Sequence, residues 1–249
     1  MRIDPRRALT FLVVAGFAGA VLFLPTISFI GNMLTPSRIA PASAAVPPVL
    51  ADAIWARANG GRATSLQPLN PFSIGRTVSC MILAERLEQP ERDIRQDECM
   101  ALLPGVEAIG YLSSVHMRRE GVWQDARVPF VQLAHMHGVT QSWTREQLID
   151  TLAARAEFGR GVVGAETAAR LYFGRAISEV TLPQAALLAA ALGDGRVDPW
   201  CDPAQAAMQR RRVLDRMRNN GAIDAAAFER ANASELGLTN PPPGKKPCG

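Results

Sequence analysis

The sequence lacks the residue patterns that build common metal sites. Its 249 residues include four cysteines and three histidines, and no two cysteines form a Cys-x-x-Cys pair, so zinc-finger spacing is absent. His135 and His137 stand two residues apart, which we interpret as incidental, and we predict no metal site among the side chains. No alternating run of β-branched residues exceeds five, which argues against a β fold.

A strong net charge is also absent outside the N-terminus. The chain has 27 basic and 23 acidic side chains. Residues 1–38 contain four of the basic and one of the acidic side chains, so the rest of the chain has 23 basic and 22 acidic ones. A surface that binds nucleic acid needs an excess of Lys and Arg to neutralise phosphates. The composition therefore excludes nucleic acid as an expected partner.

One apolar run is long enough to cross a membrane. Residues 8–30 contain no ionisable side chain, and at about 1.5 Å per residue these 23 residues span roughly 35 Å, against about 30 Å for a hydrocarbon core. Three arginines precede the run, so the positive-inside rule leaves the N-terminus in the cytoplasm. We predict an n-region and anchor over residues 1–31. A signal peptide cleaved near residues 42–44 (ASA) is the alternative.

The compartment beyond the membrane permits disulfides. The four cysteines allow three pairings, and they are Cys80, Cys99, Cys201 and Cys248. Cys80 with Cys99 and Cys201 with Cys248 would close the shorter loops, and the second bridge would tie down a Pro-rich tail over residues 239–249. Free buried thiols remain the alternative.

Short, well-capped helices follow residue 144. Thr144 with Gln147 three residues later has the form of a capping box, as does Thr181 with Gln184. Asp202 and Asp224 are placed as N-caps of two further helices. Residues 51–58 and 78–87 are predicted to be helical with weaker boundaries. The pattern predicts a mainly α domain over residues 51–238 behind a Pro- and Ala-rich linker at 32–50.

Several stretches between residues 143 and 223 form a recognisable series. They are residues 144–149 (TREQLI), 158–161 (FGRG) with Gly164, 172–175 (YFGR), 181–189 (TLPQAALLA), 198–199 (DP), Arg210 with Val213 and Leu214, and 221–223 (GAI). In order and spacing this series resembles the peptidoglycan glycosyltransferases, or transglycosylases, of family 51. A divergent monofunctional, membrane-anchored member of that family fits the layout of the chain.

The resemblance implies a lysozyme-like transglycosylase domain behind one N-terminal transmembrane helix. It further implies a single-pass protein of the bacterial inner membrane with a periplasmic C-terminal domain. Its partners would be lipid II or a glycan strand and other cell-wall synthesis proteins. In such a family a glutamate takes the proton from the attacking sugar hydroxyl, and basic groups, often with a divalent cation, help the diphosphate to leave.

The chain departs from the family pattern at the residues of the chemistry. Glu85, in residues 81–86 (MILAER), is the nearest match to the catalytic base, although the residues that should follow it are missing. Arg155 and Arg160 flank the FG loop and are the candidate substrate ligands, while the place of the second glutamate falls at Gln132. A solvated glutamate and helix-end arginines are the plain alternatives.

Three functions remain open from the sequence. The first is a divergent glycosyltransferase that polymerises lipid II with Glu85 as base. The second is a non-catalytic relative that serves as a scaffold for glycan or lipid II in the cell-wall machinery. The third is a glycan-cleaving enzyme that uses Glu85 as general acid, for which no second carboxylate is evident.

Overall fold

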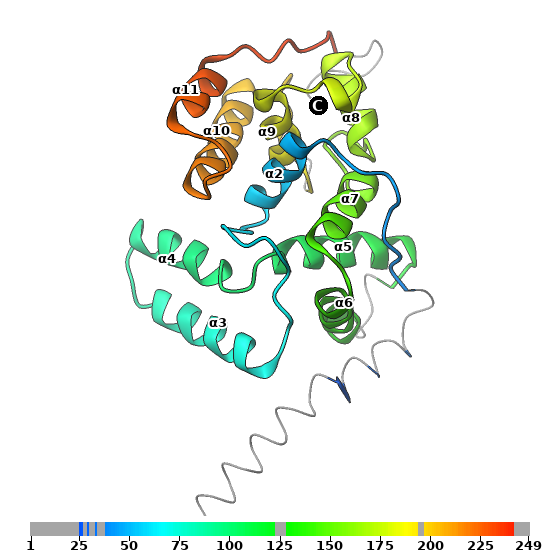
Figure 1. The fold of residues 1–249 in the computed structure, drawn as a ribbon, viewed down its shortest axis with the longest axis vertical. Coiled ribbons are helices and arrows are strands. Elements are labelled where there is room, and N and C mark those ends of the chain that lie inside the picture. The colour runs from blue at the N-terminus through cyan, green and yellow to red at the C-terminus, as the bar shows by residue number, and fades with distance from the viewer. Residues whose placement is uncertain are drawn as a thin grey trace, which may run out of the picture.

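A computed structural model describes residues 25–26, 29, 33, 38–122, 128–193 and 197–241, and its regular elements in these ranges are helices (Figure 1). The helices are α2 (Pro48–Arg57), α3 (Pro71–Ala84), α4 (Glu91–Met100), α5 (Val106–Arg119), α6 (Val128–Ser142), α7 (Arg145–Arg155), α8 (Ala165–Phe173), the 3-10 helix η1 (Ile177–Glu179), α9 (Leu182–Ala191), α10 (Pro203–Asn219) and α11 (Ala225–Ala233). The predicted mainly α fold is confirmed for this part of the chain.

The membrane anchor cannot be read from these helices. Within the described ranges, no helix has both the length and the apolar character that crossing a membrane requires. The predicted span, residues 8–30, lies outside the described residues except at 25, 26 and 29, and membrane anchoring therefore stays a prediction.

The capping signals read from the sequence are present in the C-terminal helices. The Thr144 hydroxyl accepts a hydrogen bond from the Gln147 N–H at 3.2 Å, and Gln147 Oε1 accepts one from the Thr144 N–H at 2.9 Å. Asp202 caps α10 and Asp224 caps α11, each by accepting a backbone N–H of the first turn. These local bonds satisfy N–H groups that the helix itself leaves without partners.

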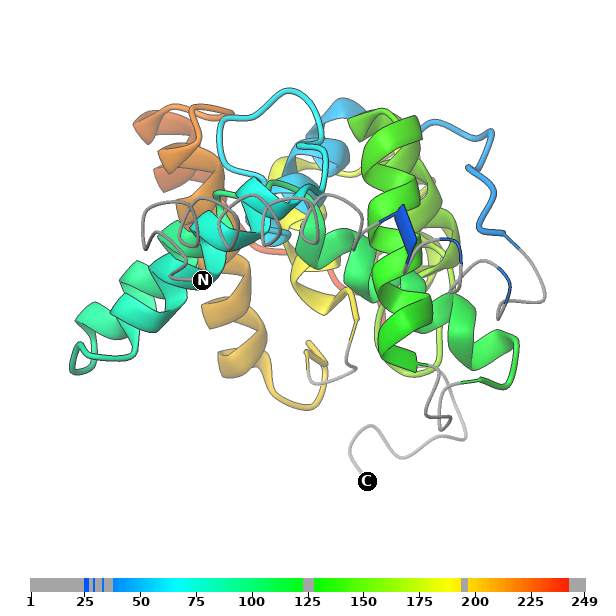
Figure 2. The same cartoon turned by 90° about the horizontal axis from the view of Figure 1, so that it is seen from below.

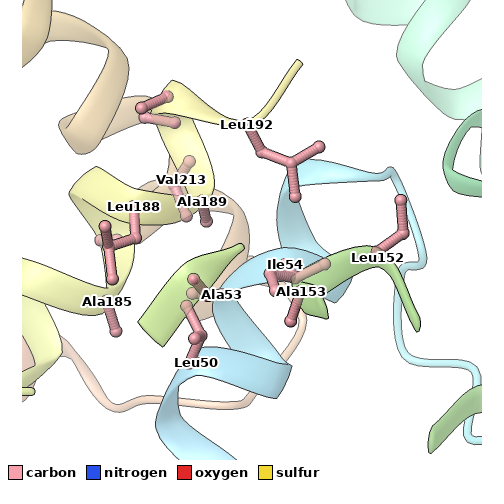
Figure 3. Close-up of a cluster of buried hydrophobic side chains, with 14 of the residues drawn as sticks. Leu50, Ala53, Ile54, Leu152, Ala153, Ala185, Leu188, Ala189, Leu192 and Val213 are labelled. Atoms are coloured by element: carbon pink, nitrogen blue, oxygen red, sulfur yellow. The ribbon is translucent and has the colours of Figure 1, made fainter. Parts of the chain in front are cut away.

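The core forms where α9 passes between α2 and α10. Residues 183–191 of α9 are all buried, and most of them are alanine or leucine. Figure 3 shows Leu50, Ala53 and Ile54 of α2 facing the same cluster as the α9 side chains. Small side chains allow helix axes to approach closely, so α9 holds the C-terminal end of α2 firmly in place.

The segment before α2 lies against the body. The Ala42 N–H donates to the Thr151 hydroxyl at 2.9 Å, and the Val46 N–H donates to an Asp150 carboxylate oxygen at 3.0 Å. Helix α2 then begins at Pro48, inside the stretch that the sequence analysis assigns to a linker.

Helices α3 and α4 lie side by side and form an arm that projects from the body (Figures 1 and 2). The disulfide between Cys80 and Cys99 joins them, which confirms that predicted pairing. At the base of the arm, Leu69 packs with Leu103 and Val106. The second predicted pairing involves Cys248, which lies outside the described residues.

Helices α5 and α6 share a buried polar contact. Ser113 Oγ and His135 Nδ1 are 2.8 Å apart, and the His116 ring meets the His135 ring nearly edge-on with centroids 5.3 Å apart. Burial, reinforced by the neighbouring His116, lowers the pKa of His135 from 6.5 to about 4. His135 is therefore a neutral core residue at pH 7.

Candidate functional site

A cavity of about 230 Å³ opens where the end of α2, the start of α5 and the segment after α9 meet. Its walls are mostly apolar, from residues such as Ile54, Leu152 and Leu192. Helix α5 begins beside α2 because Gly105 takes a left-handed conformation with φ of 84°, where a Cβ would lie 2.6 Å from the Leu66 side chain. Packing thus brings residues 57–59 next to residues 107–111.

A carboxylate and a guanidinium form the polar wall of the cavity. Glu107 Oε1 lies 2.8 Å from Arg57 Nη1, and Glu107 Oε2 accepts a hydrogen bond from Asn59 Nδ2 at 2.8 Å. The Glu107 side chain is 37% exposed and that of Arg57 is 34% exposed. Both oxygens of the carboxylate are therefore engaged, although the group faces the solvent in part.

Tyr111 connects the cavity to the loop between α7 and α8. Its hydroxyl accepts a hydrogen bond from the Glu157 N–H at 3.4 Å, and the Glu157 carbonyl accepts one from the Gly193 N–H at 3.0 Å. A Cβ at Gly193 would lie 3.2 Å from the Tyr111 ring, and φ at Gly193 is 119°. Glycine at this position lets the backbone pass closely over the ring.

The loop itself is tightly hydrogen-bonded. Glu157 and Val163 form an isolated antiparallel bridge, and the Glu157 carboxylate accepts the Gly161 N–H at 2.8 Å. The Tyr172 hydroxyl donates to the Phe158 carbonyl at 3.0 Å. Burial, with the nearby Asp198 carboxylate, raises the pKa of Tyr172 to about 12, so the hydroxyl keeps its proton at physiological pH.

Arg160, a candidate substrate ligand, makes contacts within the protein. Its Nε lies 2.6 Å from the Asp198 carboxylate, its Nη2 lies 3.0 Å from Cys201 Sγ, and its guanidinium stands 5.0 Å from the centroid of the Trp200 ring. Its backbone has a φ of 54°, which is unusual for a residue with a side chain. The side chain therefore clamps the loop to residues 198–201, and contact with a substrate stays a prediction.

Arg155, the other candidate substrate ligand, lies at the C-terminal end of α7. It is half-buried, and its carbonyl accepts a hydrogen bond from Arg119 Nη2 at 3.2 Å. It does not line the cavity. A cation at this position interacts favourably with the carbonyl end of the helix dipole. This agrees with the alternative interpretation of Arg155 as a helix-end arginine.

Glu85, the predicted catalytic base, is exposed at the end of α3. One of its oxygens accepts a hydrogen bond from Gln96 Nε2 of α4 at 2.9 Å. The end of the arm where α3 and α4 join lies away from α7 and α8 in Figures 1 and 2. The structure thus does not bring Glu85 together with the 158–161 loop, because α3 leaves the body instead of crossing under it.

Glu107, with its partners Arg57 and Asn59, is a polar group of the cavity that the sequence did not predict. Pro104 and Gly105 mark a turn, and this turn places Glu107 in the first helical turn of α5. The turn predicts that Glu107 lies in the first turn of a helix, where a carboxylate is favourable. It does not predict that the partner of Glu107 is Arg57, 50 residues earlier in the chain.

Gln132, at the expected place of the second glutamate, is half-buried on α6. Its amide lies close to Gly110 of α5. Residue 132 therefore places an amide, and not a carboxylate, next to α5.

A divalent cation, which the family resemblance implies, does not fit the described side chains. Glu107 supplies the carboxylate of the cavity, and its oxygens are held by Arg57 and Asn59. In the described ranges, no group of three or more His, Cys, Asp or Glu side chains is arranged to hold a metal ion. The described side chains of the cavity therefore do not provide the ligands that a metal-assisted reaction would need.

Comparison with known proteins matches residues 126–218 to the family model described as Transglycosylase. Penicillin-binding protein 1A of Streptococcus pneumoniae is 33% identical over 92 residues, which cover 36% of this chain and 13% of that protein. The biosynthetic peptidoglycan transglycosylase of Pectobacterium carotovorum is 38% identical over 96 residues, or 38% of each chain. That of Pectobacterium atrosepticum is 47% identical over 55 residues, or 22% of each. The chain thus spans well under half the length of these curated relatives.

The matched region contains part of the cavity. Leu152, Leu192 and Gly193 lie within residues 126–218, whereas Arg57 and Glu107 precede it. Part of the apolar wall therefore lies in the matched region, while Ile54 and both residues of the ion pair lie in the part of the chain outside the match.

Proposed function

We propose that the chain binds lipid II or a peptidoglycan glycan strand at its cavity without joining sugars, from the premise that residues 126–218 match the transglycosylase family model. The proposal is based mainly on the hydrogen bonds that Glu107 accepts. Arg57 and Asn59 engage both oxygens of this carboxylate, which is the acidic group of the cavity among the described residues.

Joining two sugars makes two demands on a protein. A base must accept the proton of the attacking hydroxyl, and positive charge must meet the departing diphosphate. In this cavity both oxygens of Glu107 already accept hydrogen bonds, one from Arg57 and one from Asn59, so the carboxylate is not a free base in the unliganded protein, whereas Arg57 keeps further N–H groups for a ligand. Glu85 lines no part of the cavity and supplies no replacement.

Binding makes smaller demands, which the cavity meets. Arg57 and Asn59 present N–H groups to the oxygens of a ligand, and Tyr111 adds a ring and a hydroxyl. The apolar side chains of Ile54, Leu152 and Leu192 cover the remaining wall. Ligand sites commonly combine such apolar walls with a few polar groups that fix orientation.

Cleavage of a glycan by the common two-carboxylate route is less well supported. That route needs two carboxyl groups on either side of the scissile bond. Among the described residues that line the cavity, Glu107 is the one carboxylate.

A polymerising enzyme is the second candidate, favoured by the exposure of the ion pair. A pair about one-third exposed is held weakly, because water screens it. A substrate diphosphate that drew Arg57 to itself would release Glu107 to act as base. This candidate makes Glu107, and not Glu85, the residue on which polymerisation depends.

The proposal includes a place in the cell. Residues 8–30 anchor the chain in the bacterial inner membrane as a single pass, and the domain that follows lies in the periplasm beside other cell-wall synthesis proteins. The Cys80–Cys99 disulfide supports an oxidising compartment. Protease added to intact spheroplasts should then remove the domain, while cleavage only after lysis would contradict this orientation.

The experiment uses the purified full chain in detergent micelles with fluorescent lipid II. We expect saturable binding and no polymer, and we expect Arg57→Met to weaken binding roughly tenfold because a charge-assisted contact is lost. Arg170→Met, at an exposed residue of α8, is the matched control and should bind like the natural protein.

Two results would refute the proposal in different ways. Polymer formed by the natural chain and lost in Glu107→Gln would establish the enzyme instead. Lipid II and isolated glycan strands that both fail to bind would remove the binding function altogether.

A further inference from the structure

A groove separates α4 of the arm from α10 of the body. It consists of two adjoining cavities of about 410 and 500 Å³, which share Asp97 and Arg216 as lining residues. Each has a volume within the usual range for ligand pockets, roughly 300–1,000 Å³. The groove is therefore large enough for a ligand of several polar groups.

Charges of both signs line the larger of the two cavities. Asp93 and Asp97 lie on the α4 side, and Arg212, Asp215 and Arg216 lie on the α10 side. With three carboxylates against two guanidinium groups, this cavity repels a polyanion. Its lining also lacks the apolar side chains that a lipid chain would need.

Some of these charges are already paired within the protein. Asp97 and Arg216 form an ion pair across the groove at 3.1 Å, and Asp215 pairs with Arg218 at 3.0 Å. Asp93 has a long hydrogen bond of 3.4 Å from the Gln89 amide, and Arg212 is exposed on the opposite wall without an ion pair among the described residues. One carboxylate and one guanidinium thus face the groove from opposite sides.

The groove is connected to the site already described. Asn59 lines the smaller groove cavity and donates to Glu107 of the first cavity. Arg216 Nη1 donates to the Arg57 carbonyl at 3.0 Å. The first cavity and the groove therefore lie on either side of residues 57–59.

We infer that this groove binds the short peptide carried by a peptidoglycan fragment whose sugar occupies the first cavity. A peptide with a free amine and free carboxylates complements the groove, since its ammonium group can pair with Asp93 and a carboxylate can pair with Arg212. The inference rests on the proposed function, because the sugar must bind next to residues 57–59.

The arm supplies a firm wall for such a ligand. The Cys80–Cys99 disulfide lies in the same helix as Asp93 and joins α4 to α3. The Asp97–Arg216 ion pair adds a contact between α4 and α10. A wall that is ordered before binding loses less conformational entropy when the peptide arrives.

The test compares two soluble probes on the full chain in micelles by calorimetry. One is a peptidoglycan disaccharide that carries its peptide, and the other is the same disaccharide without the peptide. Exposed ion pairs contribute up to about fivefold each in affinity, so two such pairs should tighten binding by roughly 2- to 25-fold at low salt. High salt should remove most of this difference.

Substitutions locate the effect. Asp93→Asn and Arg212→Gln should each reduce the advantage of the peptide-bearing probe several-fold and leave the affinity for the bare disaccharide unchanged. Glu229→Gln and Arg230→Gln, at exposed positions of α11, are the matched controls and should change neither affinity.

The outcomes separate the two proposals. Equal affinity for both probes, or an advantage that survives Asp93→Asn and Arg212→Gln, would overturn this inference while the sugar site stands. Binding of neither probe would overturn this inference together with the proposed function.

Discussion

His135 should make the stability of this protein depend on pH below neutrality, and Asn at that position should remove the dependence. The imidazole is 6% exposed, with Nδ1 against Ser113 and its ring against His116. Burial lowers its pKa in the folded protein to about 4, whereas the unfolded chain titrates near 6.5. As the pH falls from 6.5 to 4, the unfolded chain takes up the proton first, so folding loses free energy across that window.

The size of the loss follows from the two pKa values. Each unit of difference is worth about 1.36 kcal/mol, which gives a loss of about 1.4 kcal/mol at pH 5.5 and about 3 kcal/mol at pH 4. In a domain of this length, 1 kcal/mol shifts the melting temperature by roughly 2–4 °C. The contribution of His135 at pH 4 is therefore roughly 6–12 °C.

The measurement is thermal unfolding of the full chain in micelles from pH 7.5 to 4, for the natural protein and for His135→Asn. Asparagine keeps a polar group near the Ser113 hydroxyl and does not titrate. The difference between the two curves isolates the imidazole from carboxylates that titrate in the same range. His137→Asn, at a half-buried residue whose pKa is also lowered by burial, is the control and should show a smaller difference. Parallel curves for natural protein and His135→Asn would refute the reasoning.

Three further predictions concern the arm and the loop. Replacing both Cys80 and Cys99 by Ala should reduce the free energy of unfolding by about 3 kcal/mol in chemical denaturation, since the bridge closes a loop with a separation of 19 residues; an unchanged midpoint would contradict this. Arg160→Met should cost about 2–3 kcal/mol by the same measurement, because it leaves Asp198, 18% exposed, without its partner. Glu85→Gln should change neither the unfolding midpoint nor lipid II binding, and a loss of binding would restore Glu85 to the site.

The C-terminal helices could be predicted because their signals are local. Thr144 with Gln147, and Asp202 and Asp224 at their N-caps, satisfy backbone N–H groups within three residues. Such bonds depend on a few neighbouring residues, so the sequence alone identifies them. The start of α3 carried the same kind of signal, since Asn70 and Ser73 form a capping box that the sequence analysis did not use.

The site could not be predicted in the same way, because its residues meet through packing. Glu107 and Arg57 are 50 residues apart, and they meet because α2 packs on α9 and the start of α5 lies beside the end of α2. Glu85 illustrates the opposite case. Its local sequence is the nearest match to a family motif, although the residues that should follow it are missing, and the helix that it ends belongs to an arm joined by a disulfide and directed away from the loop (Figure 1).

The family match covers one part of the cavity and leaves its ion pair outside. The family match accounts for α6 to α10, and hence for Leu152, Leu192 and Gly193, which shape the space. Arg57 and Glu107, which decide whether that space holds a free base, a free cation or a neutral pair, come from α2 and α5. Similarity to the transglycosylase relatives therefore extends to part of the apolar wall and not to the ion pair. Since each partner of the pair compensates the charge of the other, the proposed binding function and the polymerising alternative differ in what a ligand does to this one ion pair.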